Sequence, residues 1–178
     1  SHEHGLTTLN IALDGEELFA ELEGPGMNFV GFEYAPSTAE QKQAIADALA
    51  SLQGDEPPFV ANPSAECRLI TASARHITED DEHDADHDAA YHHDQNEHGE
   101  GEHDDAHADT DTTAESQHSE FVAEYTYRCA EPEELSELRA NLFARFPLTT
   151  EIEASFVGPD VQAFQSLSQD NPVFKLQR

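Results

Sequence analysis

Residues 79–118 form the segment that most limits how this chain can fold. Its sequence is EDDEHDADHDAAYHHDQNEHGEGEHDDAHADTDTTAESQH, with eight histidines, sixteen Asp or Glu residues, and no Lys, Arg, Leu, Ile, Val, Phe or Met. A segment of this composition cannot bury enough apolar surface to offset the entropy lost on ordering, so we expect a flexible insert. Imidazole and carboxylate groups are ligands for divalent cations. The same segment therefore predicts metal binding.

The rest of the chain is long enough for one domain. Without the insert roughly 140 residues remain, which is sufficient for a hydrophobic core. We expect a single domain over residues 1–178, with the flexible His/Asp/Glu-rich insert at 79–117 within it. The net charge of −30, with only eight Lys and Arg residues, argues against nucleic acid and anionic membranes, because both require basic patches. No run approaches the roughly 20 apolar residues of a membrane span, so we expect no membrane insertion. No signal peptide is visible, and the start at Ser1 fits a processed chain.

Apolar periodicity predicts the fold class. Residues 9–13 and 18–22 alternate around Asp14-Gly15 as in a hairpin, and further strands are expected over 29–34, 67–76, 121–129, 151–157 and in the tail. A capping-box pattern over residues 37–40 begins a helix that Gly54 ends. Pro132 opens a second helix, whose apolar face runs to Phe146. The pattern predicts an α+β fold: a largely antiparallel β-sheet with two helices and the insert between two central strands.

The two cysteines suggest a register for these central strands. In an oxidising compartment Cys67 and Cys129 would form one disulfide, and otherwise they are two buried thiols. If the strands pair antiparallel with the cysteines opposed, His76 lies opposite Glu120, and His118 follows two residues further along. This conditional register predicts a metal site at the mouth of the insert from these three residues. The alternative is a polar hairpin end with solvated histidines.

Other histidines are candidate ligands as well. His2 and His4 would share a face of an extended strand and could close on one ion, unless they belong to a frayed terminus. The histidines inside the insert could hold several ions weakly or complete a site on the folded part. A solvated acidic linker would not need so many of them. These candidates are His83, His87, His92, His93, His98, His103 and His107.

Sequence motifs for catalysis are absent, and we expect a binding protein rather than an enzyme. The chain contains no HExxH, GxSxG, P-loop or GxGxxG motif. A copper or nickel buffer is an alternative within the binding class, because His-rich sites also take Cu(II) and Ni(II). A metal-dependent hydrolase would need one ordered ion with an open position. A third alternative is an acidic module that binds a basic protein.

A series of segments gives the chain a resemblance to a known family. The segments are His2-x-His4-Gly5 followed by LNIALDG, then PGMNFVGFEYAPST, the insert, HSEFVAEYTYRC and LFARFP. In this order they resemble the ZrgA-type periplasmic zinc-binding proteins of proteobacteria. The resemblance implies a Gram-negative periplasmic protein that binds Zn(II) and assists a zinc ABC importer, with a Cys67–Cys129 disulfide. It carries His2, His4 and His118 over as ligands, whereas Tyr34 stands where a further histidine would be expected.

Overall fold

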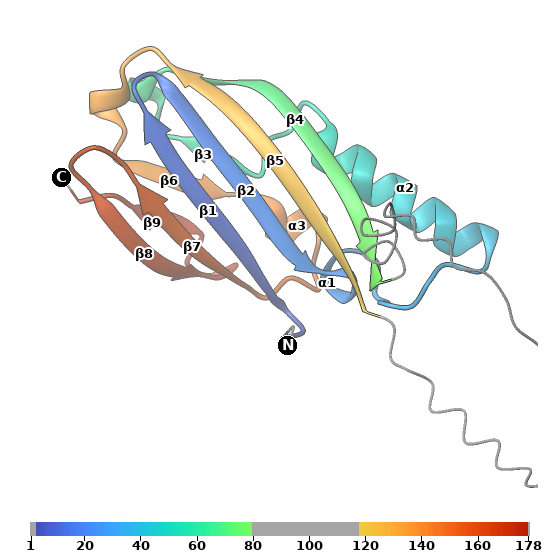
Figure 1. Cartoon of the computed structure of the whole chain (residues 1–178). Coiled ribbons are helices and arrows are strands. Elements are labelled where there is room, and N and C mark those ends of the chain that lie inside the picture. Colours follow the sequence, from blue (N-terminus) through green and yellow to red (C-terminus); the bar gives the residue numbers. More distant parts are fainter. Residues whose placement is uncertain (1–2, 80–117, 178) are drawn as a thin grey trace, which may run out of the picture.

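A six-stranded sheet, here called sheet A, is the main element of the fold (Figure 1). The computed structural model describes residues 3–79 and 118–177. Sheet A has the strand order β4-β5-β2-β1-β7-β8, and all neighbours are antiparallel except β1 and β7, which are parallel. Its strands are β1 (Leu6–Asp14), β2 (Glu17–Pro25), β4 (Cys67–Thr78), β5 (Ser119–Cys129), β7 (Glu151–Val157) and β8 (Gln162–Leu167).

The predicted hairpin at residues 9–22 is confirmed. Strands β1 and β2 pair from Thr8 opposite Glu23 to Asp14 opposite Glu17, which leaves a two-residue turn. Gly15 is the first residue of this turn and has φ of 59°. Positive φ at this position is typical of the tight turns whose twist matches that of the flanking strands, and glycine adopts it without steric cost.

One face of sheet A is covered by helix α2 (Ala39–Gln53) and by a second sheet. This three-stranded sheet B has the order β3-β6-β9, with β3 at Phe59–Ala61, β6 at Glu137–Ala140 and β9 at Val173–Lys175. Two buried tyrosines of β5 join the layers: the Tyr125 hydroxyl donates to the Leu52 carbonyl at 3.0 Å, and the Tyr127 hydroxyl donates to the Phe59 carbonyl at 3.3 Å. Burial raises the pKa of both phenols.

Helix α2 is held at both ends. Its capping box lies one residue later than predicted: the Thr38 hydroxyl accepts from the Gln41 amide, and the Gln41 side chain accepts from the Thr38 amide. At the other end, the Arg145 guanidinium donates to the carbonyls of Ser51 at 2.9 Å and Glu56 at 3.2 Å. A cation at this end satisfies carbonyls that have no partner in the helix and complements the helix dipole.

The second predicted helix is wrong. The segment after Pro132 forms a 3-10 turn, η3 (Pro132–Glu134), then strand β6, and then a single helical turn, α3 (Leu142–Arg145). Its apolar residues match helical spacing, but the sheet captures them: β6 pairs with β3 on one side and β9 on the other. A short apolar run fits either period, and tertiary pairing decides between them.

The strand predicted over residues 29–34 is also wrong. Helix α1 (Gly26–Val30) occupies the beginning of this segment, and Gly31 ends it with φ of 82° in the left-handed region. The Gly31 amide donates to the Met27 carbonyl at 3.1 Å, as at a glycine-terminated helix end. The chain then crosses in a loop to α2, and this loop carries the central residue of the candidate site.

The central hairpin is confirmed in direction but not in full register. Cys67 lies opposite Cys129 and forms a disulfide with it, and Leu69 lies opposite Tyr127 as predicted. A β-bulge between Leu69 and Thr71 then adds one residue to β4, so that His76 faces Phe121 instead of Glu120. Side chains alternate between the two faces along a strand. The one-residue shift therefore places every β4 side chain after the bulge on the face opposite to the predicted one.

The predicted fold class, α+β with mainly antiparallel sheets, is confirmed. Three α-helices occur within the described ranges, rather than two. None of the described helices combines the length and the apolar character needed to cross a membrane. The insert predicted at 79–117 lies outside the described residues apart from Glu79.

Candidate metal centre

Glu33 lies between two of the predicted metal ligands. Its Oε2 atom is 3.0 Å from Nδ1 of His118, and its Oε1 atom is 3.3 Å from Nε2 of His4. The Glu33 side chain is only 11% exposed, whereas those of His4 and His118 are 60% and 46% exposed. Three segments far apart in the sequence thus meet at one nearly buried carboxylate, with both imidazoles open to solvent.

A tight turn holds His4 in place. The Leu6 amide donates to the Glu3 carbonyl at 3.2 Å, and Gly5 adopts φ of 90° within this turn. The side chain of Asn28, which is 1% exposed, accepts from the Gly5 amide at 2.7 Å and donates to the Leu6 carbonyl at 2.8 Å. The position of His4 relative to α1 is therefore set by buried hydrogen bonds.

Gly5 cannot be replaced without disturbing this turn. A Cβ atom at Gly5 would lie 2.5 Å from Oγ1 of Thr150, and the positive φ would strain any other residue. The Gly5 carbonyl also accepts from the amides of Thr150 and Glu151, at 2.9 and 3.0 Å. The turn is thereby tied to β7 as well as to α1.

Close packing between α1 and β5 places His118 beside Glu33. A Cβ atom at Gly26 would collide with Oγ of Ser119 and would lie 2.7 Å from the Phe32 carbonyl. Glycine is therefore required where the first residue of α1 meets the first residue of β5. Because Ser119 and Phe32 are the chain neighbours of His118 and Glu33, this contact brings the imidazole to the carboxylate.

The described ends of the insert also meet at this site. Thr78 pairs with Ser119 across β4 and β5, and the His118 amide donates to the Glu79 carboxylate at 3.3 Å. Glu79 and His118, the described residues that flank 80–117, are therefore joined to each other beside Glu33. The histidines of residues 80–117 are connected to the folded part at the point where His4 and His118 already lie.

The arrangement is closed in this conformation. Each imidazole contacts the carboxylate directly, and no group of three or more His, Cys, Asp or Glu side chains in the described ranges is arranged to hold a metal ion. Oε1 of Glu33 is buried and accepts no hydrogen bond from the described residues, although Nε2 of His4 lies 3.3 Å away. A buried carboxylate oxygen in this situation is a strong acceptor for a cation.

Only part of the predicted ligand set is brought together. His4 and His118 meet at Glu33, but His4 lies in a turn before β1 and not in the strand predicted for His2-x-His4. His76 is not opposite Glu120; its ring packs on Phe121, with centroids 4.8 Å apart. His2 and the histidines of the insert lie outside the described residues.

Sequence reasoning missed Glu33, the residue on which the site is centred. It was assigned to a short strand, and one glutamate among many acidic residues carries no distinguishing signal. Its role depends on contacts 29 residues back and 85 residues ahead in the chain. No local pattern reports contacts of that range.

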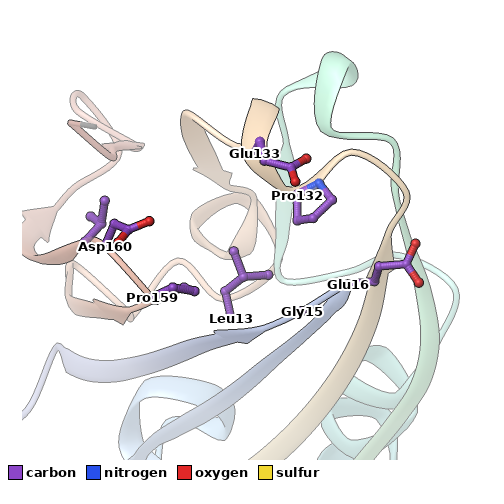
Figure 2. Close-up of a pocket in the computed structure, with 9 residues that line it drawn as sticks. Leu13, Gly15, Glu16, Pro132, Glu133, Pro159 and Asp160 are labelled. Carbon is purple, nitrogen blue, oxygen red and sulfur yellow. The ribbon is translucent and has the colours of Figure 1, made fainter.

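A separate pocket lies at the opposite end of sheet A. It has a volume of ≈ 380 Å³, and Leu13 and Val161 form part of its apolar wall. Figure 2 shows Glu133, Pro159 and Asp160 around Leu13, at the turn between β1 and β2. None of the described residues that line the pocket is a histidine or cysteine, and the pocket is remote from Glu33 because β1 runs the length of the sheet between them. We therefore place the candidate metal centre at Glu33.

Comparison with known proteins agrees with the resemblance noted in the sequence. The family model described as "ZrgA family zinc uptake protein" matches residues 1–176. A search of curated proteins finds no match to the chain. Because the family match covers nearly the whole sequence, the chain belongs to the ZrgA family of zinc uptake proteins.

Proposed function

We propose that this chain is a periplasmic Zn(II)-binding protein that captures or buffers zinc and assists its uptake through an ABC importer. The observation that carries the proposal is the convergence of His4 and His118 on the buried carboxylate of Glu33, at the base of a His-rich insert. Membership of a zinc uptake family supports zinc as the metal.

The two contacts at Glu33 are close to the spacing between neighbouring ligand atoms in a zinc site. In a tetrahedral site with metal–ligand distances of about 2.0–2.1 Å, neighbouring ligand atoms lie about 3.3–3.4 Å apart. The observed N···O separations are 3.3 Å to His4 and 3.0 Å to His118. A zinc ion held by these three side chains would displace the proton between His118 and Glu33, and the side chains would have to rearrange to enclose it, because no three described groups are already arranged for a metal ion.

A further ligand would come from outside the three residues. A four-coordinate zinc held by two imidazoles and one carboxylate has one position left. The insert precedes His118 directly in the sequence. We propose that one of its histidines, or His2, supplies the fourth zinc ligand. His76 and Glu120 remain predicted ligands, although the register places them on different faces of sheet A.

The charge of the chain supports a collecting role for the insert. A net charge of −30 raises the local concentration of cations, and sixteen carboxylates lie in residues 79–118 together with eight imidazoles. Imidazole binds metal only when neutral, and an unperturbed imidazole has a pKa of about 6.5. Zinc should therefore be released on mild acidification.

The disulfide supports the proposed compartment. Cys67 and Cys129 are joined across the central hairpin, and disulfides persist in oxidising compartments such as the bacterial periplasm. A protein there can meet the extracytoplasmic side of an importer, which is the side from which zinc must be delivered.

Zinc titration by calorimetry at about pH 7.5, above the usual imidazole pKa, tests the proposal. We would compare the full chain, a chain with residues 79–117 replaced by a short Gly/Ser linker, and the same shortened chain with His4→Ala and His118→Ala. One tight site that survives shortening and disappears with the two substitutions is expected. The Asp14→Ala substitution, at an exposed position at the end of β1 far from His4, serves as the control.

Three outcomes would contradict the proposal. Loss of all binding on shortening would mean that the folded part is only a platform for the insert. If the variant with His4→Ala and His118→Ala kept the tight site, these two histidines and Glu33 would not be the zinc ligands. Any nitrogen site is expected to bind Cu(II) more tightly than zinc, so affinity alone does not identify the metal. The metal content of protein purified from cells identifies it. Copper or nickel in that protein would contradict the assignment of zinc.

A further inference from the structure

The uncovered face of sheet A carries apolar side chains where polar ones are expected. Antiparallel strands with one solvent-exposed face normally alternate apolar and polar residues. Here Phe19, Val157 and Phe164 are 41%, 52% and 67% exposed, and Ala12 is exposed beside them. We refer to these four residues as the outer-face patch.

Strand register makes the outer-face patch continuous. Ala12 of β1 lies opposite Phe19 of β2 on one side and opposite Val157 of β7 on the other. Phe164 of β8 lies opposite Ser155, two residues from Val157 on the same face. Diagonal neighbours of this kind are within reach of an aromatic side chain. The patch therefore crosses four adjacent strands.

A groove runs beside the outer-face patch. It has a volume of ≈ 480 Å³, and its lining includes Ala12, Phe19 and Val157 together with the polar residues Asn10 and Glu21. An apolar surface beside a groove can receive a protruding ridge, whereas a flat polar sheet face cannot. Contiguous exposed apolar surface on a folded protein usually marks an interaction site.

No described element covers this face. Helix α2 and sheet B lie on the other side of sheet A, as Figure 1 shows and as the contacts of Tyr125 and Tyr127 require. Residues 80–117 are a poor cover because they contain no Leu, Ile, Val, Phe or Met. We therefore look for an apolar partner in another molecule.

The charges around the outer-face patch define that partner. Glu21, Glu23 and Glu153 project from the same face of β2 and β7. Two cations of the β4–β5 hairpin, Arg75 and Arg128, are paired with Glu124 at 3.0 Å and Glu16 at 2.6 Å. A second copy of this chain would bring the same acidic border and be repelled. A basic border on the partner would be attracted.

From these observations we infer that the outer-face patch docks a partner protein whose binding surface is an apolar ridge bordered by Lys or Arg. The inference does not depend on the zinc proposal. Ala12 is six residues along β1 from Leu6, which corresponds to roughly 20 Å at the usual rise of a strand. The acidic border reaches closer to that end of the sheet, since Glu23 and Glu153 both lie opposite Thr8, two residues from Leu6.

Site-specific photo-crosslinking tests the inference. The photoreactive residue p-benzoylphenylalanine would replace Phe164 in cells that produce the chain. The matched control is the same residue at Val60, which is 51% exposed but lies on β3 of sheet B. We expect one heterologous protein to be captured at position 164 and not at position 60.

Binding of the captured protein to purified variants then shows whether apolar contacts and charge attraction hold the complex together. We expect Phe19→Ser with Phe164→Ser to weaken binding by about tenfold or more. Glu21→Lys with Glu153→Lys should weaken it and reduce its salt dependence, whereas Val60→Ser should leave it unchanged. Each variant would also be titrated with zinc, which should bind as in the unmodified chain.

The following results would overturn the inference. Capture of nothing at position 164, of a second copy of the chain, or of the same proteins as at position 60 would each exclude a specific docking site there. Unchanged or tighter binding after charge reversal would exclude a basic border on the partner. Loss of zinc binding in the patch variants would show that their effect acts through the metal site.

Discussion

Reduction of the Cys67–Cys129 disulfide should destabilise the chain by about 4 kcal/mol. The two cysteines are 62 residues apart in the sequence, so the bond closes a long loop in the unfolded chain. In the chain-entropy description the stabilisation grows with the logarithm of loop length, and about 62 residues correspond to about 4.3 kcal/mol. We expect the folded hairpin to keep its ladder of strand pairing after reduction, so that the effect falls mainly on the unfolded state.

The length of the insert gives this prediction a second, more specific part. Most of the closed loop between Cys67 and Cys129 is the insert. A six-residue linker in place of residues 79–117 would shorten the loop to roughly 29 residues, and the bond would then contribute about 3.6 kcal/mol. Reduction should therefore cost the shortened chain less than the full chain, by roughly 0.7 kcal/mol.

Urea denaturation with and without reductant measures both parts. A Cys67→Ala/Cys129→Ala variant controls for other effects of the reductant and should be insensitive to it. Reduction is the cleaner perturbation, because Cys129 is fully buried and its replacement also removes packing. A loss below about 1 kcal/mol, or a larger loss in the shortened chain, would refute the loop-entropy reasoning.

Three further predictions concern single groups. Glu33→Gln should weaken the tight zinc site by about 10- to 100-fold while leaving binding by the insert intact, and calorimetry on the shortened and full chains would separate the two; equal affinity would remove Glu33 from the site. Arg145→Ala should cost about 2–3 kcal/mol, because the carbonyl of Ser51 in the last turn of α2 and that of Glu56 beyond it lose a charged donor; an unchanged urea midpoint would contradict this. Alkaline pH should unfold the chain: the folded-state pKa of Tyr125 and of Tyr127 is raised above the ordinary 10.0, so stability is full below about pH 10 and falls above it by about 1.4 kcal/mol per pH unit for each tyrosine. Tyrosinate absorbance against pH, which should rise for these two residues only with unfolding, provides the check.

Secondary-structure elements could be predicted from the sequence where the local apolar pattern matches the face that the element buries in the core. The β1–β2 hairpin, strand β7 and helix α2 are such elements, since each has one apolar periodicity and clear end signals. The segment from Pro132 to Phe146 is the opposite case. Leu135, Leu138 and Leu142 have helical spacing, yet Leu138 is buried in a strand because β3 and β9 are available to pair with it.

The candidate metal centre was also predicted only in part. The abundance of His, Asp and Glu indicated a metal-binding protein, and His4 and His118 were identified as candidates from the sequence. Their partner Glu33 was not, and His76 was assigned to the wrong face of the hairpin. One bulged residue near Ile70 is enough to reverse the facing of every later residue of β4, and no sequence pattern announced it.

The sequence by itself carried the candidate ligand types, the composition of the segment 79–118, and the alternation that builds sheet A. These properties depend on side-chain type and local spacing, which a chain carries before it folds. The tertiary structure alone decided which face each side chain of β4 occupies, that Asn28 and Gly26 bring two distant chain segments to Glu33, and that an apolar patch remains uncovered on sheet A. These depend on pairing and packing between residues remote in sequence, where one inserted residue or one missing Cβ atom changes the outcome.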